Sequence, residues 1–302
     1  MAAAAPLQGL VAVATDSSAC LPAELAAAWG VLIAPLQVII DDQAFDEGAP
    51  DTSGGIAPGA VVEALVGGRR VTTSQPGPEA LLGVAQRAAE QGATHLVFVS
   101  LSGAISGTAL AMEAVAAGAP LPVTVVDSGT VSLAAGLAAL SAAAVARSGG
   151  SAADVALEAR RAASTSLCLF TVDTLEYLRR GGRVSDTMAA LGDALGLRPV
   201  LGLVDGHIDQ VERVRTSAKA RAQVLSLIGD HATQLSHPVV GIMTLAGDEE
   251  MVAAARDTIG ARGDWPAVYA GLSAVLAAHG GPGSLAAAVV DVHPDVAAAL
   301  AS

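Results

Sequence analysis

The stretch Leu-Val-Phe-Val-Ser-Leu-Ser-Gly-Ala-Ile-Ser-Gly-Thr, residues 96–108, decides the fold expected for this chain. Its first five residues form a short apolar run rich in β-formers, which predicts a buried strand. Two Ser-Gly pairs follow before the helix-prone residues 109–117. A strand, a Ser/Gly loop and a helix start point free backbone N–H groups and hydroxyls at an anion. The same residues also fit an ordinary turn with a helix N-cap, so the rest of the chain must decide between the two.

Strand-like and helix-like segments alternate along the whole chain. Apolar runs at residues 10–14, 31–40, 123–126 and 167–172 predict further strands, and helical stretches separate them. This alternation predicts an α/β fold with a largely parallel sheet that is covered on both faces. Residues 41–58 are polar and broken by Gly and Pro, so we expect a long loop there.

A domain boundary is expected at Ser148-Gly149-Gly150-Ser151, a small polar run between two helical stretches. It divides the chain into an N-terminal α/β domain with a largely parallel sheet, residues 7–150, and a mixed α/β C-terminal domain, residues 151–302. In the second half, Asp205-Gly206 lies between two β-like runs and predicts a hairpin turn. Residues 191–197 are expected to be helical.

Composition and charge exclude several classes of protein. The 302 residues are 52% hydrophobic but only 2% aromatic, and the net charge is −13. Such an acidic surface repels phosphodiester backbones, so we expect no nucleic-acid partner. Residues 131–146 are the longest apolar stretch and are too short and Ala-rich for a membrane span, so they predict a buried helix. The N-terminus lacks the basic and apolar regions of a secretory signal, and we expect a soluble cytoplasmic protein.

Familiar catalytic and cofactor motifs are missing from the sequence. Lys219 is the only lysine and is followed by Ala220, which excludes a Walker A loop. No Gly-x-Gly-x-x-Gly follows the first strand, and Gly-x-Ser-x-Gly is absent. The histidines are scattered, and Cys20 and Cys168 suggest two reduced, buried thiols rather than a zinc site. We therefore expect no metal and no cofactor.

Small hydroxyl donors recur at the predicted strand-to-helix crossings. They are Thr72, Thr73, Ser74, Ser102, Ser106 and Ser128, and His279 could join them from the second half. The aliphatic composition leaves room for an apolar tunnel beneath such a polar mouth. These residues alone indicate a binding site for an amphipathic anion.

Several motifs occur in an order that resembles the DegV family, the bacterial fatty acid-binding proteins that present acyl chains to a fatty acid kinase. The resemblance covers residues 11–292. The motifs are Thr15-Asp16-Ser17-Ser18, Thr73-Ser74-Gln75-Pro76, residues 101–108, Val126-Asp127-Ser128, residues 175–183, Val214-Arg215-Thr216 and His279-Gly280-Gly281-Pro282-Gly283.

The resemblance implies a two-domain DegV-like fold, with one long-chain fatty acid in a tunnel as the ligand. The carboxylate-binding set that it implies is Thr72, Thr73, Ser74, Ser102, Gly103, Ser106, His279 and Gly280. Arg183 and Arg215 match basic positions near the tunnel mouth that face the kinase and the acyl phosphate. Gly103 departs from the family pattern, which commonly has a second serine there, so its N–H is expected to replace that donor. His279 is expected in a Gly-rich loop. The implied partners are the fatty acid and the kinase, and the resemblance leaves room for transient contact with a membrane surface.

Two other functions stay open at this point. A serine hydrolase acting on a small lipid ester could use Ser102 or Ser106 with His279 and an Asp, although the nucleophile elbow is missing. An interaction module without any ligand is the third class.

The arginines also have a structural alternative to contact with a phosphate or a partner. Arg179, Arg180 and Arg183 could simply complement the dipole of a helix end.

Overall fold

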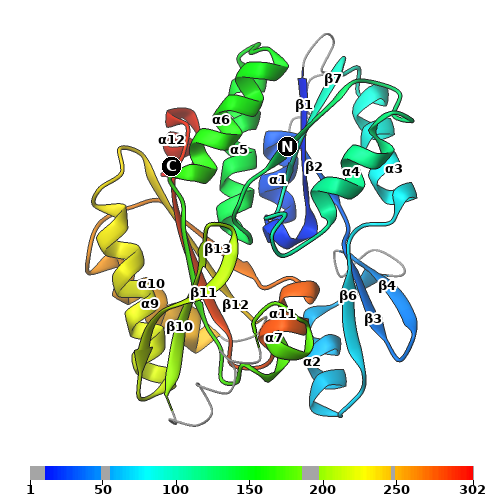
Figure 1. Ribbon diagram of the computed structural model, residues 1–302. Coiled ribbons are helices and arrows are strands. Elements are labelled where there is room, and N and C mark those ends of the chain that lie inside the picture. The colour runs from blue at the N-terminus through cyan, green and yellow to red at the C-terminus, as the bar shows by residue number, and fades with distance from the viewer. Residues whose placement is uncertain (1–10, 49–54, 186–196, 246–248, 302) are drawn as a thin grey trace.

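The computed structural model describes residues 11–48, 55–185, 197–245 and 249–301, and these form three sheets with helices packed around them (Figure 1). We label the four-stranded sheet that contains β1 as sheet A. Sheet B is the four-stranded sheet that contains β3, and sheet C is the six-stranded sheet that contains β14. In the described part of the chain, no helix is both long enough and apolar enough to cross a membrane.

Sheet A is parallel throughout and confirms the strand predicted at the start of the 96–108 stretch. Its strands, in spatial order, are β2 (Val31–Ala34), β1 (Val11–Asp16), β7 (His95–Ser100) and β8 (Val123–Asp127). Both faces are buried: Leu96 and Phe98 pack against α3 (Pro78–Glu90) and α4 (Thr108–Ala116), and Val97 and Val99 lie on the opposite face. This explains why β7 is apolar at successive positions rather than at alternate ones.

Helix α5 (Leu133–Arg147) lies between sheet A and sheet C (Figure 1). The buried helix predicted for residues 131–146 is confirmed, since nearly every residue of α5 is buried. Its Ala-rich surface lets two sheets approach it at once. At Gly241 on β12, an added Cβ would come within 2.8 Å of the Leu133 Cβ, so glycine is required for this approach. The helix therefore joins the two halves in one core.

Sheet C is mixed, as expected for the second half. Its order is β11 (His207–Val214), β10 (Arg198–Val204), β9 (Leu167–Thr171), β14 (Leu285–Asp291), β12 (Pro238–Thr244) and β13 (Ala267–Gly271), with only β12 and β13 parallel. The predicted Asp205-Gly206 hairpin is confirmed, and both residues have positive φ, at 48° and 79°. Helices α9 (Ser217–Ala232) and α10 (Glu249–Gly260) cover the outer face. The predicted helix at 191–197 lies almost entirely outside the described residues.

Sheet B corrects two predictions made from the sequence. Residues 31–40 are not one strand, because the chain breaks at Pro35 and continues as β3 (Gln37–Ile40) in a different sheet. The expected loop at 41–58 contains β4 (Gln43–Glu47) and β5 (Gly55–Ile56). Asp41 and Asp42 have φ of 47° and 70°, so they turn the β3–β4 hairpin without glycine. β6 (Val71–Ser74) pairs with the other edge of β3.

The core of sheet B is completed by a helix from the far end of the chain. Helix α2 (Pro58–Val66) covers Val38 and Ile40, and α11 (Ala274–Gly280) packs beside it through Val275 and Ala278. Sheet B, α2 and α11 lie together in the lower part of Figure 1, next to the short helix α7 (Glu176–Arg180). This contact places the C-terminal residues around His279 beside β6.

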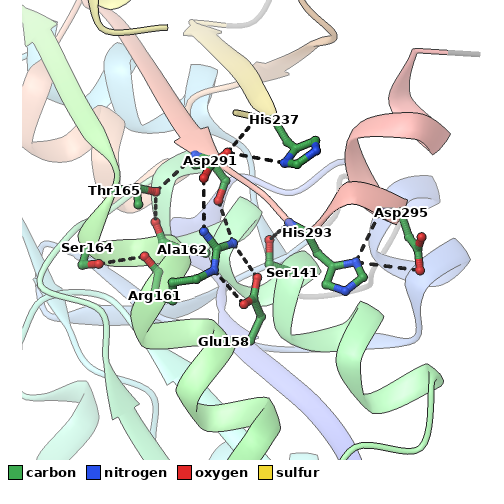
Figure 2. Close-up of polar contacts among 10 residues, drawn as sticks. All are labelled: Ser141, Glu158, Arg161, Ala162, Ser164, Thr165, His237, Asp291, His293 and Asp295. Atoms are coloured by element: carbon green, nitrogen blue, oxygen red, sulfur yellow. Dashed lines mark hydrogen bonds and ion pairs between the residues drawn. The ribbon is translucent and has the colours of Figure 1, made fainter. Parts of the chain in front are cut away.

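A polar cluster ties the helical layer to the end of sheet C (Figure 2). Helix α6 (Ala152–Ser164) packs on α5, β7 and β8, and its Arg161 forms two hydrogen bonds with the Glu158 carboxylate at 2.6 and 2.7 Å. The same guanidinium donates to the Asp291 carboxylate and carbonyl at the end of β14. Asp291 also accepts from the backbone N–H of His237, which directly precedes β12. The division at residue 150 stays a prediction, and α5 and α6 pack together across it. Within the described residues, the remaining α-helices are α1 (Ala23–Trp29) and α12 (Pro294–Leu300).

Candidate functional site

A cavity of about 230 Å³ lies where the three sheets meet. Strand β6, the β7–α4 loop, the loop before α5, strands β9 and β14, and helix α11 all contribute to its wall. Most of the wall is aliphatic or aromatic, as at Leu101, Val131, Phe170, Leu272 and Val275. The polar residues of the wall are Thr73, Ser74, Gln75, Ser106, Ser132, Arg183, His279 and Ser284.

Thr73 and His279 meet in this wall across 206 positions of sequence, with 2.8 Å between Oγ1 and Nε2. Thr73 lines the cavity, whereas its neighbour Thr72 on β6 is exposed and does not line it. His279 lies in the last turn of α11, so the prediction of a Gly-rich loop is wrong at this residue. The helix ends one residue later, where Gly281 has a φ of 71°. Gly280 also lines the cavity.

His279 is neutral in this environment. Burial, and to a smaller extent the positive charge of Arg183, together lower its pKa from 6.5 to about 3. Nδ1 is buried and has no hydrogen-bond partner among the described residues. It lies so close to Gly181 that an added Cβ there would collide with the imidazole ring. A neutral imidazole carries one N–H, so Nε2 donates to Thr73 Oγ1 when it carries that proton and accepts from the Thr73 hydroxyl when Nδ1 carries it.

Arg183 lies beside this pair and lines the same cavity. Its Nε donates to the Ile105 carbonyl at 3.1 Å, and Nη1 donates to the Gly181 carbonyl. In the described part of the chain, no carboxylate forms an ion pair with it. Partial burial lowers the pKa of the guanidinium. An arginine held by two carbonyls with no counter-charge is suited to an anion that enters from the cavity.

Ser106 and Ser74 bring further hydroxyls to the same wall. The Ser106 hydroxyl pairs with that of Thr108 at 2.9 Å, just before α4 begins. Gln75, next to Ser74, reaches so close to Gly107 that a Cβ at that glycine would clash with its side-chain oxygen. These contacts link β6 to the β7–α4 loop. The hydroxyls of the two segments therefore belong to one site.

Four predicted site residues lie outside the cavity wall: Thr72, Ser102, Gly103 and Arg215. Ser102 is 1% exposed, and its hydroxyl donates to the Gly206 carbonyl at 2.8 Å, which ties the loop to the β10–β11 hairpin. The Gly103 N–H donates to both oxygens of the Asp127 carboxylate at 3.1 Å. Arg215 is exposed just after β11. Sequence reasoning missed Gln75, Ser132 and Ser284; the Thr-Ser-Gln-Pro motif pointed to Gln75, whereas nothing in the sequence marked the other two.

The hydrolase alternative needs a serine, a histidine and a carboxylate in hydrogen-bond contact. Ser102 and Ser106 instead pair with Gly206 and Thr108, and the bond of His279 goes to Thr73. Within the described residues no carboxylate orients the imidazole, because Nδ1 has no partner.

In the described part of the chain, the His, Cys, Asp and Glu side chains form no group of three that could hold a metal ion.

Known proteins resemble this chain both in sequence and in structure. A sequence model described as "uncharacterised protein, DegV family" matches residues 10–292. A DegV domain-containing protein of Streptomyces coelicolor is 38% identical over 283 residues, which cover 92% of this chain and 98% of that protein. A solved structure that describes fatty acid binding of a DegV family protein from Thermus thermophilus has a TM-score of 0.83 and 33% identity, covering 94% of this chain and 100% of that one. DegV of Bacillus subtilis, described as a fatty acid binding protein, has a TM-score of 0.81 and 26% identity, with coverage of 94% and 100%.

Proposed function

Because this chain belongs to the DegV family, we propose that it binds one long-chain fatty acid in the cavity and presents the carboxylate to a fatty acid kinase. Solved DegV structures are described as fatty acid binding proteins, including the Thermus thermophilus and Bacillus subtilis ones. The carboxylate would lie at the polar part of the wall and the acyl chain along the apolar part. The chain would then act as a carrier, and the kinase would supply the chemistry.

The observation that carries this proposal is that four polar residues of a largely apolar wall, Thr73, His279, Arg183 and Ser106, follow one another along it. Thr73 bonds His279, whose ring packs against Gly181, and the Gly181 carbonyl accepts from Arg183. Arg183 in turn donates to Ile105, which precedes Ser106. A ligand with one charged end and a long apolar remainder matches such a wall.

The energetics agree with this class of ligand. Each buried methylene gains about 0.8 kcal/mol, so roughly a dozen of them gain on the order of 10 kcal/mol before the costs of association. A carboxylate that is desolvated without partners costs several kcal/mol, which is why the polar groups must be gathered at one place. Thr73, Ser74 and Ser106 supply hydroxyl donors, and Arg183 supplies the opposite charge.

The protonation state of His279 favours a donor role for Thr73. A neutral imidazole that donates from Nε2 to Thr73 Oγ1 leaves the threonine proton free to point at a carboxylate. The imidazole then orients a donor and carries no charge itself. In this arrangement Arg183 is the only cation in the wall of the cavity within the described residues.

Presentation to a kinase requires that the carboxylate end can be reached from outside. Arg183, Ile105 and Ile208 line both the inner cavity and a second, more open cavity of about 480 Å³. His207 and Asp209 from the β10–β11 hairpin complete the outer wall. A phosphoryl donor would approach from this side, and the exposed Arg215 would then contact the partner kinase rather than the fatty acid.

The test is ligand titration on a variant whose cavity is filled. Leu276 lines the cavity, so Leu276→Trp is expected to weaken binding of oleate and palmitate at least tenfold. Leu157→Trp is the matched control, because Leu157 is 65% exposed on α6. Equal affinity of both variants and the parent protein would show that the acyl chain does not occupy this cavity.

A further inference from the structure

Glu47, the last residue of β4, has a buried carboxylate that the proposed ligand contacts do not use. The residue is 7% exposed, and no described Lys, Arg or His forms an ion pair with it. Burial raises its pKa, and the nearby charge of Asp16 acts in the same direction. A buried carboxylate without a cation persists only where hydrogen bonds and packing require it.

The hydrogen bonds of Glu47 join three separate elements. One carboxylate oxygen accepts from the Ser17 hydroxyl at 2.5 Å, just after β1. The other accepts from the Val275 N–H at 2.7 Å, in the first turn of α11 and 228 positions away in sequence. Ser17 Oγ itself accepts from the Leu36 N–H at 2.9 Å, so its proton must point at Glu47. Glu47 thus holds the start of α11 against sheets A and B.

The same helix carries His279 at its other end. Val275 and His279 are four residues apart, which places them on one face of α11, and both line the cavity. Helix α11 spans only Ala274–Gly280, about 10 Å, so a shift at its first turn moves its last turn as well. Ser273 caps the Leu276 N–H, and Glu47 provides the acceptor for the neighbouring Val275.

We propose that Glu47 is a positioning residue for the fatty acid site, which sets His279 against Thr73 by fixing the start of α11. This inference rests on the proposed function, because it names the residue that holds a ligand-binding group in place. Glutamine can keep the bond from Val275 and can donate to Ser17 instead of accepting from it. Alanine removes both contacts.

The experiment is a thermodynamic cycle between Glu47 and His279, with oleate and palmitate as probes. Glu47→Ala is expected to weaken binding at least tenfold, whereas Glu47→Gln stays within threefold of the parent protein. Asp46→Ala is the matched control, since Asp46 is the exposed neighbour on β4 and pairs only with Gln37 in the described structure. In a His279→Ala background, Glu47→Ala is expected to cost less than a further threefold.

Two results would overturn the inference: parent-like binding by Glu47→Ala, or the same loss in both backgrounds, which would indicate general destabilisation. If Glu47→Ala does not fold, Ser17→Ala takes its place in the cycle. The ¹⁵N shifts of the His279 imidazole in ligand-free protein give a readout that needs no ligand. They should move in Glu47→Ala and stay unchanged in Asp46→Ala. If the parent protein binds neither fatty acid, the proposed function fails, and these shifts still decide whether Glu47 positions His279.

Discussion

Replacing Thr73 with valine removes one hydroxyl from the wall of the cavity and keeps the shape of the side chain. This hydroxyl lies 2.8 Å from His279 Nε2 in a hydrogen bond. In the proposed complex it accepts from Nε2 and donates its single proton to the fatty acid carboxylate. After the substitution, both the imidazole and the carboxylate lose a partner in a cavity whose wall is mostly apolar. We therefore expect Thr73→Val to weaken fatty acid binding.

The size of the effect follows from the cost of an unsatisfied buried polar group. Leaving one such group without its partner costs about 1–3 kcal/mol. Since 1.4 kcal/mol corresponds to a tenfold change in affinity, the expected loss is roughly 5- to 150-fold. A β-branched residue replaces another on β6, so the fold itself should change little.

The assay is titration with oleate and palmitate, together with thermal unfolding of the same preparations. Thr72→Val is the control, because Thr72 is adjacent on β6 but exposed on the other side of the strand. If Thr73→Val binds as tightly as the parent protein, the Thr73 hydroxyl does not contact the carboxylate. Equal losses of affinity in Thr72→Val and Thr73→Val would also contradict that contact.

Two further predictions concern the charged and titratable groups. Arg183→Met should lower fatty acid affinity tenfold or more, because Arg183 lines the cavity. Arg215→Ala should keep fatty acid affinity within threefold and lower kinase-dependent acyl phosphate formation tenfold. Ligand titration and a coupled phosphorylation assay measure the two effects, and the reverse pattern would contradict the roles proposed for the two arginines. The folded-state pKa of His279 is about 3 and lies below the ordinary 6.5, so its contribution to stability is complete above pH 6.5 and is lost as the pH falls toward 3. Between pH 7 and 4.5 the parent protein should therefore lose about 3 kcal/mol more unfolding free energy than His279→Ala. Urea unfolding at both pH values checks this, and a parallel loss in the two proteins would contradict it.

Asp16 contributes to stability with the opposite sign. Burial raises its pKa from 3.8 to about 6, so its contribution is complete below pH 3.8 and is lost as the pH rises through about 6. Because Asp16 is present in both proteins, it cancels from the comparison of the parent with His279→Ala. The difference between the two curves then reports His279.

The sequence is sufficient to predict those elements whose local residue pattern agrees with their tertiary environment. The apolar run of β7 is buried on both faces, and the Asp205-Gly206 turn needs positive φ at both positions, so each could be recognised from its own residues. Sheet B could not be recognised in this way. Its β4 is mostly exposed, and its hairpin turns at Asp41-Asp42 rather than at a glycine.

The candidate site could be predicted only in part, for a similar reason. The sequence motifs predict Thr73, Ser106 and His279 as polar residues of the site, and all three line one cavity. Ser102 was selected on the same grounds, yet its hydroxyl is directed to the Gly206 carbonyl of a hairpin 104 positions away. Whether a serine faces a ligand or a backbone carbonyl depends on such distant contacts. The role inferred for Glu47 likewise depends on a helix 228 positions later.

The most direct test of the central claim is denaturing extraction of the purified, folded protein, followed by mass spectrometry of the released lipid. We expect a long-chain fatty acid at close to one molecule per chain, and much less from Leu276→Trp prepared in the same way. Folded protein that releases no acyl chain, and that takes up neither oleate nor palmitate when they are added, would contradict it.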